Sequence, residues 1–66
     1  MKNNLKIERV LKELTQQSLA DRVDVTRQTI NALEKCKFVP STVLAIKIAK
    51  VFNKTVEDIF FLEPSD

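Results

Sequence analysis

The 66-residue sequence has no glycine, histidine, tryptophan or tyrosine, and only one cysteine, Cys36. Without histidine and with a single cysteine, the chain lacks the ligands of a structural zinc site and cannot form an internal disulfide. It also has no histidine for acid–base catalysis and no glycine-rich loop to hold a nucleotide phosphate. An enzyme is therefore the least expected class of function, and we expect no cofactor, no metal and no small-molecule ligand.

Long apolar runs are missing as well. The longest are four residues each, at positions 43–46 and 59–62, whereas a membrane helix needs about 20. The N-terminal residues carry no apolar run of the kind found in a signal peptide. We therefore expect a soluble, cytoplasmic protein that makes no contact with a membrane.

The length allows only one domain, which spans residues 1–66. We expect its core over about 5–60 and a C-terminal tail at 61–66. A domain this small buries only a thin core. Since disulfides and zinc are excluded, its stability must come from a well-packed helical core, a partner chain, or both.

Hydrophobic spacing and capping residues predict five short helices and an all-α fold. The helices are expected over residues 5 to about 13, 16–23, 27 to about 35, 42–52, and from 56 to near 60. Hydroxyl side chains stand where four of them begin, as N-caps prefer, at Thr15, Thr26, Ser41 and Thr55. Asp58 completes a capping box with Thr55.

The fourth helix has a clean apolar stripe, at Leu44, Ala45, Ile48, Ala49 and Phe52. The first helix is less regular, because its apolar residues cannot all share one narrow stripe. We expect its core contacts from Leu5, Ile7, Val10, Leu11 and Leu14. With glycine absent, Asp24 and Asn53 are the residues expected to take a positive φ at helix ends.

The segment from Thr15 to Lys35 has the pattern of two short helices joined by a tight turn at Asp24. Ala20 is small where the two helices must meet, and Ile30 and Leu33 anchor the second of them to the core. That arrangement leaves the other face of the second helix free. It is polar and carries Arg27, Gln28, Thr29 and Asn31, beside the small Ala32.

These four polar side chains suit base edges in a DNA major groove. Glutamine and asparagine bond adenine, arginine bonds guanine or a phosphate, and a threonine methyl group touches thymine. In helix-turn-helix proteins, the N-terminal residues of the second helix reach the bases. We therefore predict base contacts from Arg27, Gln28, Thr29 and Asn31. For Arg27, both a base and a phosphate are possible partners.

Phosphate contacts are expected around this face. Helix N-termini attract anions, which points to Gln16, Gln17 and Thr26, while Lys35 and Lys37 flank the other side. Residues 26–54 carry six basic side chains and one acidic one, a net charge of +5, and residues 55–66 carry four acidic ones and no basic one. This asymmetry fits a phosphate-facing surface, although an ordinary solvated surface would also explain it.

Five stretches together resemble the Cro/repressor-type, or xenobiotic-response-element, helix-turn-helix family. They are Thr15-Gln16-x-x-Leu19-Ala20, the run from Val25 to Lys35, Pro40-Ser41, Leu44-Ala45-x-Lys47-Ile48-Ala49, and the run from Val56 to Phe60. The resemblance implies a lambda-repressor-like bundle of five short helices, dimeric binding to a two-fold operator, and transcriptional control. It also implies an ion pair between Arg9 and Glu34.

The chain departs from the family pattern at several positions. Family members usually have glycine near positions 13, 24, 36 and 53, where this chain has Glu13, Asp24, Cys36 and Asn53. Position 8 is often apolar in the family and is Glu8 here. Aspartate and asparagine replace glycine well in a left-handed conformation, and glutamate and cysteine less so.

Phe60, Phe61 and Leu62 are too many adjacent apolar residues for one small domain to bury. We expect Phe60 to close the core, and Phe61 and Leu62 either to cover a homodimer interface or to fold over their own core. Cys36 lies between Lys35 and Lys37, a setting that suggests a redox role, but an inert cysteine is the simpler interpretation.

The function expected is a sequence-specific, double-stranded DNA-binding regulator of transcription, a repressor that binds a palindromic operator as a homodimer. The alternative is a helical protein-interaction module, such as an antitoxin or a co-activator-like adaptor, because one fold can carry several functions. The exposed face of Arg27 and Gln28 separates the two, since a protein-binding groove would need apolar or aromatic anchors there.

Overall fold

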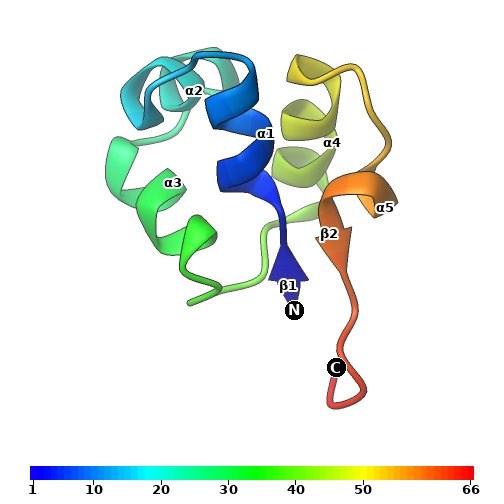
Figure 1. The fold of residues 1–66 in the computed structure, drawn as a ribbon. Coiled ribbons are helices and arrows are strands. Elements are labelled where there is room, and N and C mark those ends of the chain that lie inside the picture. The colour runs from blue at the N-terminus through cyan, green and yellow to red at the C-terminus, as the bar shows by residue number, and fades with distance from the viewer.

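Five helices and one pair of short strands make up the fold in the computed structural model, which describes residues 1–66 (Figure 1). The helices are α1 (Leu5–Leu11), α2 (Gln16–Val23), α3 (Arg27–Glu34), α4 (Thr42–Val51) and α5 (Val56–Ile59). The strands are β1 (Lys2–Asn3) and β2 (Phe60–Phe61). The predicted all-helical bundle is confirmed, and the largest boundary error is at the end of α1, two residues earlier than expected.

Hydroxyl side chains begin four of the helices, as the sequence predicts. The side chains of Thr15, Thr26, Ser41 and Thr55 each accept a hydrogen bond from the backbone N–H three residues on. At α5 the capping box is complete, because the Asp58 carboxylate also accepts from the backbone N–H of Thr55. The backbone N–H of Thr55 and, after it, the Thr55 side chain lower the pKa of Asp58 below its usual value, because hydrogen bonds to the carboxylate favour its ionised form.

Four non-glycine residues adopt a left-handed conformation, with φ between 55° and 62°. They are Glu13, Asp24, Cys36 and Asn53. These are the four positions at which the family that the sequence resembles usually has glycine. After each one, the next backbone N–H reaches back five residues, as in Leu14 to Arg9 and Lys37 to Ala32, both 3.0 Å. This Schellman pattern satisfies carbonyl groups at the helix end and holds the backbone in place without glycine.

The core lies where α2, α3 and α4 meet, with Leu5, Ile59 and Phe60 adding to it. Ala20, Ile30 and Leu33 are fully buried, as expected for the residues that join α2 to α3. The stripe of α4 is buried at Ala45, Ile48, Ala49 and Phe52, and Leu44 packs against it. The predicted core is therefore confirmed for these three helices.

The prediction for α1 is wrong at three positions. Ile7, Val10 and Leu11 are between 57% and 74% exposed, and of this helix only Leu5 and Glu8 are buried. The helix has just seven residues, so only one turn of its inner face reaches the core. The other apolar residues project outward on the opposite side.

Glu8 occupies the inner position where the family often has an apolar residue. It is only 9% exposed, and the Nζ atom of Lys54 donates a hydrogen bond to its carboxylate at 2.5 Å. A buried carboxylate needs such a partner, because an unpaired charge is costly to remove from water. Lys54 therefore compensates for the charge at this position.

The two ends of the chain meet in a short antiparallel sheet, in which Lys2 pairs with Phe61 and Asn3 with Phe60. Phe60 is buried, as expected. The pairing of this tail with the N-terminal residues was not predicted from the sequence. Beyond the sheet, the N-terminal ammonium lies 3.4 Å from Glu63 and 3.1 Å from Asp66.

None of the helices is both long enough and apolar enough to span a membrane.

Glycine should be favoured over glutamate at position 13, because a Cβ atom makes the left-handed conformation unfavourable. We expect Glu13→Gly to raise the free energy of unfolding by about 0.5–1 kcal/mol in urea titrations. Glu13→Ala is the control, since it removes the same side chain but keeps the Cβ atom. A gain of equal size in both variants would contradict the backbone explanation.

Candidate nucleic-acid interface

The helix-turn-helix unit is formed by α2 and α3, joined at Asp24. Asp24 ends α2 in a left-handed conformation, and its N–H bonds the Ala20 carbonyl. Because Ile30 and Leu33 hold one face of α3 in the core, the face with Arg27 and Gln28 is turned to solvent. The turn and the two anchors thus fix the direction in which the predicted base-reading residues point.

The predicted reading residues lie at the beginning and middle of α3. Arg27, Gln28 and Asn31 line a cleft of about 230 Å³ to which no hydrophobic residue contributes. Thr29 is half-buried, and its hydroxyl lies 3.0 Å from that of Thr26. We call the cleft of Arg27, Gln28 and Asn31 the reading cleft. Its amide and guanidinium groups provide several donors in a small area.

Thr26 is used as a cap, because its hydroxyl accepts from the Thr29 N–H at 3.2 Å. Gln17 is exposed, and its amide donates to Asp21 one turn further along α2 at 2.8 Å. Lys35 and Lys37 are exposed beyond the last turn of α3. The predicted phosphate-contacting residues therefore form two groups, one at the start of the two helices and one after the end of α3.

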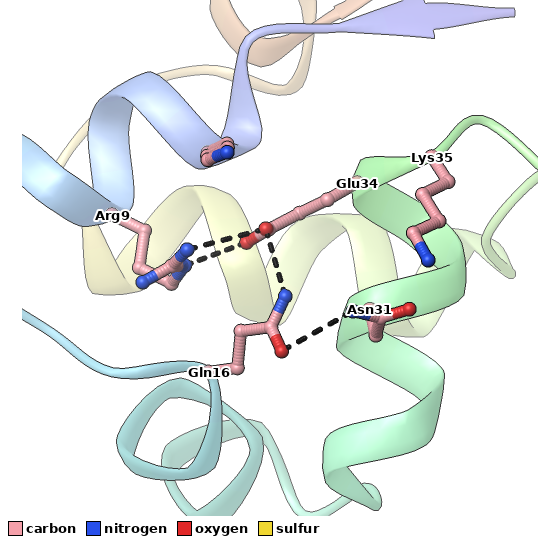
Figure 2. Close-up of a pocket in the computed structure, with 6 residues that line it drawn as sticks. Arg9, Gln16, Asn31, Glu34 and Lys35 are labelled. Atoms are coloured by element: carbon pink, nitrogen blue, oxygen red, sulfur yellow. Dashed lines mark hydrogen bonds and ion pairs between the residues drawn. The ribbon is translucent and has the colours of Figure 1, made fainter.

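A polar network joins α1, α2 and α3 (Figure 2). The Nε atom of Arg9 lies 2.6 Å from Oε2 of Glu34, and Nη2 donates to Oε1 at 3.3 Å. Arg9 also donates to the Leu14 carbonyl at 2.8 Å. The side chains of Arg9 and Glu34 are only 12% and 5% exposed. This bidentate pair ties the first helix to the end of α3.

Gln16 continues the network to the reading residues. Its Nε2 atom donates to Glu34 at 3.1 Å, and its Oε1 atom accepts from Asn31 at 3.4 Å (Figure 2). Two residues predicted to contact DNA are thus held by each other and by the ion pair. The amide of Gln16 is occupied inside the molecule, which leaves its backbone N–H, in the first turn of α2, as the group available to a phosphate.

The network is the floor of a second cleft, of about 250 Å³, whose walls contain no apolar residue. Its lining residues are Lys6, Arg9, Gln16, Asn31, Glu34 and Lys35. We call it the network cleft. Lys6 was not among the predicted site residues. Lys6 lies three residues before Arg9, and residues with this spacing share one side of a helix. This spacing is the feature of the sequence from which Lys6 could have been predicted.

A family model described as helix-turn-helix matches residues 5–59 of the chain. The chain belongs to the helix-turn-helix family, in its Cro/repressor type. Proteins of this family use the second helix of the motif to contact DNA. In this helix-turn-helix protein the corresponding helix is α3, with the reading cleft on its exposed face.

Similar proteins carry names that agree with the family. An uncharacterized HTH-type transcriptional regulator of Methanocaldococcus jannaschii is 53% identical over the whole of both chains. The uncharacterized HTH-type transcriptional regulator YgzD of Bacillus subtilis is 48% identical over 96% of each chain. A third, from Archaeoglobus fulgidus, is 47% identical over all of this chain and 93% of its own.

Removing Arg9 should destabilise the helix-turn-helix protein strongly, because the charge of Glu34 would remain buried without a cationic partner. We expect Arg9→Met to lower the free energy of unfolding by about 3 kcal/mol, as measured by thermal or urea unfolding. Arg22→Met, at an exposed arginine of α2, is the matched control and should change it by less than about 0.5 kcal/mol.

The double variant Arg9→Met/Glu34→Met provides the second test of this pair. It removes both charges and should recover most of the stability lost in Arg9→Met. If Arg9→Met and Arg22→Met were equally stable, the pair would not hold α1 to α3.

Proposed function

We propose that this helix-turn-helix protein is a sequence-specific regulator of transcription that binds double-stranded DNA through the major groove. The observation that carries the proposal is the exposed polar face of α3, where Arg27, Gln28 and Asn31 line one cleft without an apolar residue. A protein-binding groove needs apolar anchors, whereas base edges need donors and acceptors.

The proposed base contacts come from the reading cleft and from Thr29. Gln28 is the best candidate for a bidentate contact with adenine, because its side chain is exposed and hydrogen bonds from glutamine fit adenine N6 and N7. Arg27 contacts either guanine or the adjacent phosphate. Asn31 lies deeper and is held by Gln16, which favours contact with one defined base.

Phosphates are proposed to bind on both sides of the bases. On one side are the backbone N–H groups that begin α2 and α3, at Gln16, Gln17 and Thr26; on the other are Lys35 and Lys37. Neither lysine belongs to any of the four ion pairs in the structure, so their charges are available. Such contacts set position without reading sequence.

A homodimer is proposed to form through Phe61 and Leu62. Phe61 is 43% and Leu62 is 81% exposed, although both are apolar. They follow the buried Phe60 at the end of the small sheet, so a single copy leaves them in water. Two copies related by a two-fold axis would read a palindromic operator with half-sites about one helical turn apart.

The proposed outcome is repression in the cytoplasm, by occupation of a promoter. The affinity should fall steeply with salt, because lysine and arginine displace counterions from DNA. If the protein selects no DNA site, that result would support the alternative function, an antitoxin or co-activator-like interaction module.

Selection of bound sequences from random duplexes tests the reading role of Gln28. We expect one enriched site for the unmodified protein, and for Gln28→Ala a loss of preference at one base pair in each half-site. That loss should amount to about 1–3 kcal/mol, or roughly 5- to 150-fold.

Gln17→Ala is the matched control, because Gln17 is also an exposed glutamine but lies on α2. It should weaken binding to every sequence alike or leave binding unchanged. An identical selected site for Gln28→Ala and the unmodified protein would remove Gln28 as a reader.

Sedimentation equilibrium at micromolar concentration tests the dimer. The protein should sediment as a dimer, and Leu62→Glu should shift it toward the monomer, because the interface would bury an unpaired carboxylate. Leu11→Glu is the control, since Leu11 is 74% exposed on α1, away from the proposed interface. A monomeric protein, or equal dissociation in both variants, would contradict the proposal.

A further inference from the structure

The network cleft is lined only by polar and charged residues. Its six lining residues come from α1, from the start of α2, from α3 and from the residue that ends α3, and all are polar or charged. Pockets for small organic ligands are mostly apolar with a few polar groups. A cleft lined only by polar and charged residues, three of them cationic, instead suits an anion such as a phosphate group.

The charges in the network cleft leave an excess of two cations. Glu34 is neutralised by the bidentate contact with Arg9 and also accepts a hydrogen bond from Gln16, so its oxygens are already occupied. Lys6 of α1 and Lys35 after α3 both line the cleft and take part in none of the four ion pairs. An anion between the two ammonium groups would be attracted by both and would relieve their mutual repulsion.

The position of the cleft places it beside the bases. Asn31 lines both the network cleft and the reading cleft, so the two are neighbours on the same surface. When a recognition helix lies in the major groove, the sugar-phosphate strands that border the groove run past the elements next to it. The network cleft lies at the junction of α1, α2 and α3, next to the recognition helix. We therefore expect one of these strands to pass it.

We infer that one backbone phosphate of the bound DNA lies over the network cleft, held between Lys6 of α1 and Lys35 after α3. The inference rests on the proposed DNA binding and adds Lys6, and with it α1, to the interface. The phosphate would bridge the first helix and the recognition helix, whose relative position is already set by Arg9 and Glu34. Lys6 would therefore position α3 in the groove without reading a base.

The first experiment compares Lys6→Gln with Lys12→Gln on a duplex that carries the selected site. Lys12 is an exposed lysine at the other end of α1 and does not line the cleft. We expect Lys6→Gln to reduce the slope of log affinity against log salt by up to about 0.9 per protomer. It should also weaken binding to selected and random duplexes by the same factor, whereas Lys12→Gln should change neither.

The second experiment replaces single phosphates of the duplex with neutral methylphosphonates. At one phosphate in each half-site, the replacement should abolish the effect of Lys6→Gln and also that of Lys35→Gln, because both lysines contact that group. If the two lysines map to different phosphates, the shared site is wrong. If Lys6→Gln behaves like Lys12→Gln, the inference fails entirely.

These outcomes are separable from the proposed function. If the unmodified protein selects a site and loses it on Gln28→Ala while Lys6→Gln is silent, only the phosphate site is overturned. If the unmodified protein selects no DNA sequence and shows no salt-dependent binding, the proposed function fails and this inference fails with it. Lys6 is exposed, so its substitution should leave the melting temperature unchanged, and a thermal melt of each variant checks this.

Discussion

The ion pair between Arg9 and Glu34 is the interaction on which the arrangement of the candidate interface depends. It is almost fully removed from solvent and joins α1 to the last turn of α3. A buried pair of charges adds little net stability but makes any arrangement that separates them costly. The pair therefore acts mainly on geometry, because α3 cannot move relative to α1 without exposing an unpaired charge.

Gln16 links the ion pair to the exposed polar face of α3. It accepts from Asn31 and donates to Glu34, so the half-buried Asn31 is connected to the ion pair through two hydrogen bonds. By contrast, Gln28 and Arg27 are exposed and free to adapt to a base edge. The reading cleft thus combines one preorganised side chain, Asn31, with two adjustable ones, and preorganisation reduces the conformational entropy that is lost on binding.

The chain adopts left-handed backbone conformations without glycine, the residue that takes them most easily. At Glu13 and Cys36, the two least favourable substitutes, the chain still adopts φ values of 58° and 57°. The hydrogen bonds that close each helix end, together with the packing of the next segment, outweigh a local cost of about 1–2 kcal/mol. A thin core therefore has to compensate for several such positions at once.

The sequence by itself determined the helices, their caps and the core of α2, α3 and α4, because capping and stripe periodicity depend on residues close together in the chain. It also placed Ile30 and Leu33 inward, and hence Arg27 and Gln28 outward. Only the tertiary structure decided that Ile7, Val10 and Leu11 face solvent, that Glu8 pairs with Lys54, and that Lys2 and Asn3 pair with β2. Each of these depends on groups far apart in sequence, such as Glu8 and Lys54, whose meeting no local pattern encodes. The same holds for the network cleft, where Lys6 and Lys35 face one space only because three helices pack together.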